Sequence, residues 1–318
     1  MGGRSSTPEE YRSYYSANSH ITKATNASQV FRSSGMAPEF DPSQMKLPRE
    51  ACDSAESPRS RGIIYAEDVT GSMGRFLLSL IKDEFPRLIN QTYESVSYNP
   101  HIMFMGVGDA AASDRAPLQV TQFEADLRML DQLQKIYLER GGGGNDYESY
   151  ILPWYFAAKH IRMDCWEKRG EKGFLFTFGD EEPTPHLTKQ EISKVFGKNS
   201  SIQERMLTGQ ECLEMASEKF NCYHIILHGS YYSSYPRDVV SKWKKLMGGH
   251  ACDLSDHTKL PELVTTILRM HEGMTKTEAI AKIQDEHARR VVANALCDHE
   301  EEVVNSAVEA NGAPIDVF

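Results

Sequence analysis

Three oxygen-bearing side chains, Asp68, Thr70 and Ser72, follow the apolar run 62–67 at intervals of two residues. The apolar run is typical of a buried strand, and a helical pattern begins at Gly74. Ligands of open α/β sheets bind outside the carboxyl ends of the strands, which is where these side chains would lie. Carboxylate and hydroxyl oxygens suit a hard cation such as Mg²⁺, which keeps several waters. The spacing therefore predicts a divalent-cation site.

Three later loops carry acids at comparable positions. One follows the predicted strand 97–107, one is the glycine run 141–144 between two predicted helices, and one follows the predicted strand 173–178. An acid after a strand is often a helix cap and a glycine run is often a turn, but parallel strands bring their carboxyl ends to one edge. The polar residues of these loops that we consider are Asp109, Asp114, Asn145, Asp146, Glu148, Asp180 and Glu181.

The elements that must position these residues alternate between short strands and longer helices. This alternation predicts an α/β fold, doubly wound, with a mainly parallel central sheet of about six strands flanked by helices. The predicted strands are 62–67, 97–107, 118–121, 173–178, 222–228 and 250–254. The predicted helices are 74–92, 123–139, 146–162, 188–197, 203–220, 236–247 and 258–273.

The two ends of the chain differ from its middle in composition. Residues 1–60 are rich in Ser, Pro, Arg, Asn and Tyr and contain almost no Val, Ile or Leu. Such a segment is expected to bury little apolar surface, which predicts a disordered or draped arm without core residues. Residues 61–274 form the predicted α/β domain. Residues 275–318 are predicted to be a helical extension with a loose acidic tail.

Composition restricts the partners and the compartment. The formal net charge is −10, from 35 Lys and Arg against 45 Asp and Glu, which argues against nucleic acid as a partner. No apolar run reaches the roughly 18 residues of a membrane span, so no membrane is expected. Six cysteines without a CxxC pair are typical of reduced thiols, which favours a cytoplasmic location. The oligomeric state stays open.

Two segments resemble the von Willebrand factor A (vWA) domain and its metal-ion-dependent adhesion site. Asp68-Val-Thr-Gly-Ser-Met73 resembles the Asp-x-Ser-x-Ser element after the first strand of that family, with Thr in place of the first Ser. Phe176-Thr-Phe-Gly-Asp180, followed by Pro183, resembles the element after the fourth strand. The resemblance covers about residues 61–274 and implies a vWA or Rossmann-like fold.

The glycine-rich loop departs from the usual pattern of this family, which carries Gly-Gly-Thr. Here the chain has Gly143-Gly144-Asn145-Asp146, which is closer to an intracellular branch that includes domains attached to atypical α-kinases. Asn145 stands where the Thr would be, and Glu148 stands where that branch has Glu. Asp109 resembles an Asp that the branch keeps after its second strand.

The resemblance implies a binding function instead of catalysis. The chain would hold Mg²⁺, with Mn²⁺ or Ca²⁺ as alternatives, and would capture an Asp or Glu side chain of a protein partner. The implied metal ligands are Asp68, Thr70, Ser72, Asp180 and Asn145, with Asp146 and Asp109 as further candidates. Aromatic and acidic residues near these loops, Tyr231, Tyr232 and Glu181, are the predicted partner contacts.

An enzyme is the alternative interpretation. Asp68-Val-Thr-Gly-Ser also resembles the nucleophile loop of haloacid-dehalogenase-like phosphotransferases, in which the Asp attacks a phosphoryl group beside Mg²⁺. Gly108-Asp109 with Asp114 matches the acidic loop of those enzymes. That loop should come late in the chain, however, and Thr70 stands where the phosphatases often carry a second carboxylate.

Overall fold

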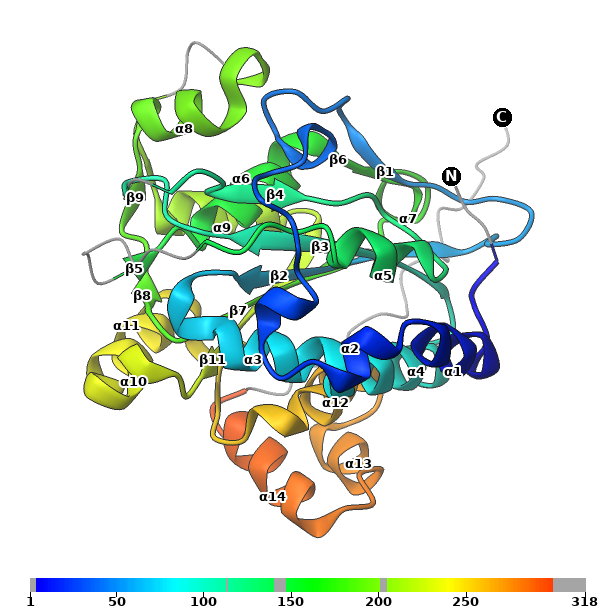
Figure 1. Cartoon of the computed structure of the whole chain (residues 1–318). Coiled ribbons are helices and arrows are strands. Elements are labelled where there is room, and N and C mark those ends of the chain that lie inside the picture. The colour runs from blue at the N-terminus through cyan, green and yellow to red at the C-terminus, as the bar shows by residue number, and fades with distance from the viewer. Residues whose placement is uncertain (1–3, 113, 140–146, 201–204, 300–318) are drawn as a thin grey trace, which may run out of the picture.

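A six-stranded sheet lies at the centre of the computed structural model, which describes residues 4–112, 114–139, 147–200 and 205–299 (Figure 1). Its strand order is β12-β11-β7-β2-β3-β4. All neighbours are parallel except β4, which is antiparallel to β3. The predicted sheet is thus confirmed, with the strands β2 (Ser60–Asp68), β3 (Asn99–Val107), β4 (Leu118–Val120), β7 (Gly173–Gly179), β11 (Phe220–Leu227) and β12 (Ala251–Leu254).

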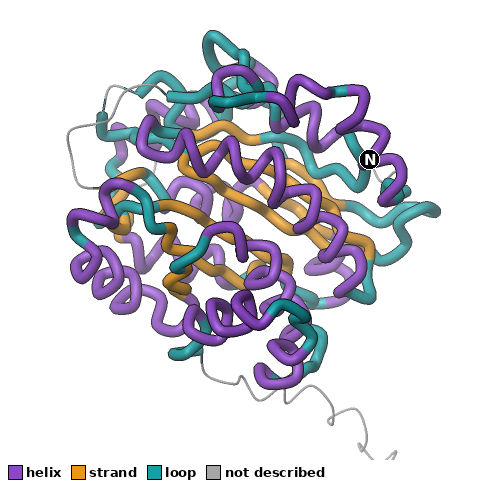
Figure 2. Tube along the Cα trace, turned by 60° about the horizontal axis from the view of Figure 1, so that its bottom comes forward, coloured by secondary structure: helices purple, strands orange, loops and turns teal. Residues whose placement is uncertain are grey.

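Helices cover both faces of this sheet (Figure 2). Side chains alternate along β2, so that Ile63 and Tyr65 belong to one hydrophobic core and Ile64 and Ala66 to the other. The first core is closed by α3 (Gly74–Ser79), α4 (Phe85–Ser95), α5 (Arg128–Leu133), α12 (Leu260–His271) and α14 (Glu286–Ala295). The second is closed by α6 (Ile151–His160), α8 (Lys189–Phe196), α9 (Gly209–Ser217) and α11 (Pro236–Met247).

Four predicted helices differ from those observed. The helix expected at 203–220 begins only at Gly209, because Leu207–Thr208 form β10, which pairs with β9 (His186–Leu187). The helix expected at 74–92 is divided by a π-helical turn, η4 (Leu80–Glu84), next to Pro86, which has no N–H to continue the ladder. The helix expected at 123–139 shortens to α5 because Glu124 instead pairs with Ile102 of β3. The helix expected at 146–162 begins only at Ile151, because Tyr147–Glu148 form β5, which pairs with β8 (Glu182–Pro183).

The N-terminal arm contributes core residues, so the expectation that it lacks them is wrong. It contains α1 (Pro8–Ala17) and α2 (Ser19–Lys23), and its strand β1 (Arg49–Ala51) pairs with β6 (Ile161–Met163). The sequence prediction considered aliphatic residues, whereas much of the buried surface of the arm is aromatic. Its buried members in the first core include Tyr11, Ile21, Val30, Phe31 and Phe40.

At the other end, α13 (Lys276–Ala281) and α14 follow α12 and lie against it (Figure 1). The predicted acidic tail begins at Glu300 and lies outside the described residues. Within the described residues, no helix has both the length and the apolar character required to span a membrane.

Candidate metal site

The order of the strands changes direction at β2. From β2 the chain adds β3 and β4 on one side and then returns to place β7, β11 and β12 on the other. Such a switch point leaves a crevice outside the carboxyl ends of the two strands beside it, which are here β2 and β7. Asp68 is the last residue of β2, and Asp180 directly follows β7. The fold therefore brings these two predicted residues to the same place.

The Asp68 side chain is completely buried and receives three hydrogen bonds. Its Oδ1 accepts from the Thr70 backbone N–H at 2.8 Å and from the Thr70 hydroxyl at 2.6 Å. Its Oδ2 accepts from the Tyr150 hydroxyl at 3.0 Å. All three donors are neutral, so these partners leave the charge of the carboxylate without a counter-ion.

The two hydroxyl residues of the motif lie in the turn after β2. Thr70 is buried, and because its hydroxyl proton is directed at Asp68, the lone pairs of that oxygen face elsewhere, as a hydroxyl ligand requires. Ser72 lies in the short 3-10 helix Gly71–Met73, and its side chain is outside the described part of the structure.

Asp180 is also completely buried. Its Oδ2 accepts a hydrogen bond of 2.9 Å from the backbone N–H of Tyr231, in the short helix α10 (Ser230–Ser234). Gly229 lies directly against this carboxylate, because a Cβ atom at that position would overlap the Asp180 side chain. The turn after β11 is therefore shaped around Asp180.

The predicted partner contacts lie beside this turn but differ in their surroundings. Tyr231 contributes a backbone donor to Asp180, and the Tyr232 hydroxyl donates to Asp253 while its ring stacks on His228. The backbone carbonyl of Glu181 accepts from the Trp243 indole. Tyr235 is the more exposed tyrosine of this group, at 51%.

Tyr150 is the site residue that the sequence analysis missed. It stands just before α6, is fully buried, and reaches Asp68 through its hydroxyl. A Cβ atom at Gly179, the last residue of β7, would overlap that hydroxyl. Tyr150 thus fills the space between the ends of β2 and β7. Its only sequence signal is its place two residues after Glu148, at the start of a predicted helix.

Of the remaining predicted residues, Asp109 and Glu148 lie in the described part of the structure. Asp109 is buried, and its Oδ1 accepts from the Ala111 N–H at 2.8 Å and from the hydroxyl of Ser149, the residue after β5, at 3.2 Å. Asp109 thus joins its own loop to the turn before α6. Glu148 is 2% exposed, and its Oε2 has no hydrogen-bond partner among the described residues. Asn145 and Asp146 lie outside the described residues.

The electrostatics of the site are those of crowded, buried acids. Burial, together with the nearby Asp180, raises the pKa of Asp68 to about 7, although its hydrogen bonds oppose the shift. Burial raises the pKa of Glu148 well above its ordinary value, and Asp68, Glu181 and Asp109 add to the effect. A cation at this edge would favour the ionised form of each carboxylate. The Glu148 oxygen that lacks a hydrogen bond in the described part of the structure fits that requirement.

The described carboxylates do not by themselves provide a full set of metal ligands. Among the residues that the structure describes, there is no group of three or more His, Cys, Asp or Glu that could hold a metal ion. A cation bound between Asp68 and Asp180 would thus depend on hydroxyl oxygens and water as well, which suits Mg²⁺.

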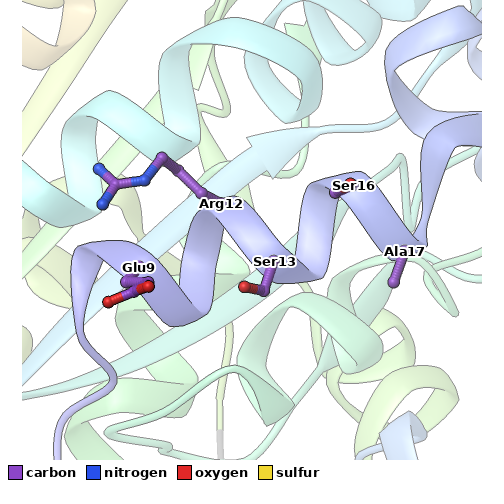
Figure 3. Close-up of a pocket in the computed structure, with 5 residues that line it drawn as sticks. All are labelled: Glu9, Arg12, Ser13, Ser16 and Ala17. Carbon is purple, nitrogen blue, oxygen red and sulfur yellow. The ribbon is translucent and has the colours of Figure 1, made fainter.

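A surface hollow lies elsewhere on the molecule (Figure 3). It is lined by Glu9, Arg12, Ser13, Ser16 and Ala17 of α1, which Figure 1 places on the opposite side of the molecule from α10. None of the candidate site residues lines it, so the hollow and the candidate metal site are separate features.

Comparison with known proteins does not assign this chain to a family. No family model matches the chain, and no curated protein matches it. Two solved structures of the pilus adhesin SpaC from Lactobacillus rhamnosus GG, one in an open conformation, are similar at 8% sequence identity, with TM-scores of 0.42 and 0.41. Each similarity covers 67% of this chain and 30% of the adhesin, so the chain spans less than a third of the adhesin's length.

Proposed function

We propose that this chain is a divalent-cation-dependent protein-interaction module of the vWA type, whose bound cation captures an acidic side chain of a partner. One observation carries the proposal. The Asp68 carboxylate is completely buried at a switch point of the sheet, its hydrogen-bond donors are all neutral, and its charged neighbour is another carboxylate, Asp180. Burying ionised carboxylates in this way is costly unless a cation compensates them.

The residues that would hold the cation are Asp68 and Asp180 with the hydroxyl of Thr70, and Ser72 by its place in the motif. Thr70 fixes the orientation of Asp68 through two hydrogen bonds, and the N–H of Tyr231 orients Asp180. When bound, a divalent cation would supply positive charge and coordination positions that an incoming carboxylate can occupy.

The arrangement favours binding over phosphoryl transfer. A nucleophilic Asp needs a basic residue beside it to hold the phosphoryl group. The hydrogen-bond partners of Asp68 in the described part of the structure are Thr70 and Tyr150, and neither is basic.

Thermal melting and calorimetry in the presence of Mg²⁺ test the proposal. A cation at about 100 times its Kd should stabilise the folded chain by about 2.7 kcal/mol through mass action. Asp68→Asn should remove this stabilisation. The matched control is Asp83→Asn, an exposed acid on η4, which should respond to Mg²⁺ as the wild type does.

The capture step has its own readout. Acetate can stand in for the carboxylate of the partner, and Mn²⁺ can replace Mg²⁺ as a relaxation probe. Acetate should lower the water-proton relaxation enhancement of protein-bound Mn²⁺, because it replaces a metal-bound water. Failure of the wild-type chain to bind Mg²⁺, Mn²⁺ or Ca²⁺ would refute the proposed function. Aspartyl-fluoroberyllate at Asp68, with Mg²⁺-dependent hydrolysis of an aryl phosphate, would instead establish the phosphotransferase.

A further inference from the structure

Asp180 and Glu181 form the whole of the turn between β7 and β8. The first strand ends at Gly179, and the second begins at Glu182. Both strands are paired, β7 with β2 and β11, and β8 with β5. The place of the Asp180 carboxylate is therefore set by two residues of backbone and by the groups that hold them.

The backbone of this turn is held by the indole of Trp243, on α11. Its Nε1–H donates to the Glu181 carbonyl at 2.9 Å. The Trp243 side chain is completely buried, and an indole nitrogen can only donate. Without this donor, the carbonyl would have to turn toward water or another N–H, and the two-residue turn would move with it.

The Trp243 ring is fixed by other aromatic rings. His224 of β11 stacks on it with the centroids 3.4 Å apart. Tyr150 and Trp154 lie edge-on to it, with centroids 5.5 and 6.1 Å away. The N–H is thus aimed at the turn by packing from β11 and from α6. These ring contacts do not depend on the N–H itself.

The chain segment that leads to Trp243 also holds the Asp180 side chain. The Tyr231 N–H donates to Oδ2 of Asp180 at 2.9 Å, and Gly229 lies directly against the carboxylate. The segment 229–243 therefore contacts Asp180 at its carboxylate and at the carbonyl of the next residue. One contact orients the side chain, and the other fixes the backbone.

We propose that Trp243 is a positioning residue of the cation site, whose N–H fixes the backbone after Asp180 and thereby holds this carboxylate in the orientation that cation binding requires. The proposal rests on the cation site proposed above. Groups that orient a metal ligand typically change metal affinity by about 10–100-fold. The N–H, and not the bulk of the ring, should carry the effect.

The test is the Kd for Mg²⁺, measured by calorimetry with MgCl₂ on the full chain. Trp243→Phe keeps a buried ring but removes the donor, and its Kd should rise by about tenfold or more. Trp154→Phe makes the same change at a buried tryptophan whose N–H has no hydrogen-bond partner among the described residues, and it should bind as the wild type does. Normal affinity in a Trp243→Phe protein that melts cooperatively would overturn the proposal. Equal losses in both variants would overturn it too, because they would show an effect of core packing alone.

A second measurement uses the wild-type chain and does not depend on Trp243→Phe folding. The chain has three tryptophans, so ¹⁵N-tryptophan labelling gives three indole N–H signals, which Trp154→Phe and Trp166→Phe assign. Trp166 lies on α7 (Asp164–Arg169), which precedes β7 and so lies at the other end of that strand from Asp180. On addition of MgCl₂ the Trp243 signal should shift while the Trp166 signal stays in place. A Trp243 signal that does not move although calorimetry shows binding would overturn the role of Trp243. Absence of binding of Mg²⁺, Mn²⁺ or Ca²⁺ by the wild type would instead refute the site itself.

Discussion

At the scale of single residues, the site combines a buried carboxylate with donors that are all uncharged. Asp68 sits at the end of a central strand, so the fold holds it in a place where ionisation is unfavourable without a counter-charge. The adjacent Glu67 is also buried, on the opposite side of β2, and within the described segments neither of its carboxylate oxygens has a hydrogen-bond partner. Ionising the carboxyl groups at the carboxyl end of β2 therefore costs free energy in the folded chain.

The raised pKa of Asp68 predicts how stability depends on pH in the metal-free protein. Its pKa is about 7 in the folded state against an ordinary 3.8, so folding favours the protonated form. The free energy of unfolding should fall as pH rises from about 4 to about 7, by at most about 1.4 kcal/mol per pH unit from this group. Asp68→Asn should make this part of the curve flatter, as measured by urea unfolding at several pH values. Equal slopes for variant and wild type would contradict the shift.

At the scale of secondary-structure elements, the turns after β7 and β11 pack closely against each other. Gly229 is at an ordinary extended φ of −80°, so its need for glycine arises from the close approach of Asp180. The same argument applies to Gly179 and the Tyr150 hydroxyl. Two glycines, at and just beyond the ends of strands, thus determine where two side chains of the candidate site can lie.

Gly229→Ala should therefore weaken cation binding by tenfold or more, since Asp180 must move to admit the methyl group. Gly74→Ala is the matched control, because a Cβ atom there meets nothing within 4 Å and the residue begins α3. The control should bind normally. Calorimetry and melting of both variants decide the point. Normal Mg²⁺ affinity in Gly229→Ala would mean that Asp180 is not a ligand.

A second feature at the scale of secondary-structure elements is the histidine cluster that joins α12 to the C-terminal segment. The hydroxyl of Tyr223 on β11 lies 2.8 Å from Nε2 of His271 and 3.0 Å from Nε2 of His299. The Tyr223 ring stacks on His250. Burial lowers the pKa of His271 to about 3, and nearby Arg61, His250 and His299 contribute. The packed cluster thus requires a neutral His271.

The free energy of unfolding should consequently fall as pH drops below about 6.5, because the unfolded chain takes up a proton that the folded His271 resists. The loss from this residue should reach about 1–2 kcal/mol by pH 5.5. His271→Phe keeps an aromatic ring without the titration and should reduce the acid sensitivity. His20→Gln, on the partly exposed surface of α2, serves as the control. Unchanged acid sensitivity in His271→Phe would contradict the assignment.

At the scale of the whole molecule, the arm is part of the folded body. The Tyr15 hydroxyl donates to the Ile81 carbonyl at 2.9 Å, and the Tyr14 hydroxyl donates to Asp131 at 2.6 Å. Met45 and Ala51 belong to the core on the opposite face of the sheet from Phe31. The arm therefore supplies both hydrophobic cores.

Phe31→Ala should cost about 3–5 kcal/mol of unfolding free energy, the range for removal of a buried aromatic side chain. Ser34→Ala, three residues away and exposed, should change it by less than about 0.5 kcal/mol. Chemical denaturation of the two variants measures the difference. A small loss in Phe31→Ala would show that the arm is not integral to the fold.

The sequence was sufficient to predict the structure where the local pattern and the tertiary structure agree. The apolar runs at β2 and β7 predicted both strands, and the acids at their ends followed from the position of each strand end. Tyr150 could not be predicted, because its contact with Asp68 joins residues 82 positions apart. The burial of Phe31 and the short α5 were missed for a related reason. In both cases a distant partner, and not the local pattern, decides the structure.

The position of the arm also has a consequence for the order of folding. The Ser33 hydroxyl donates to the Lys135 carbonyl, and the Asn199 amide donates to the Pro42 carbonyl, so the arm is held by residues 102 and 157 positions later. Contacts that close such long loops form late and slowly. During synthesis, the segment around Pro42 must therefore wait for more than half the chain to emerge before its contact with Asn199 can form. Until then this part of the arm is incompletely packed, and in that interval the chain would be most prone to aggregate or to recruit a chaperone.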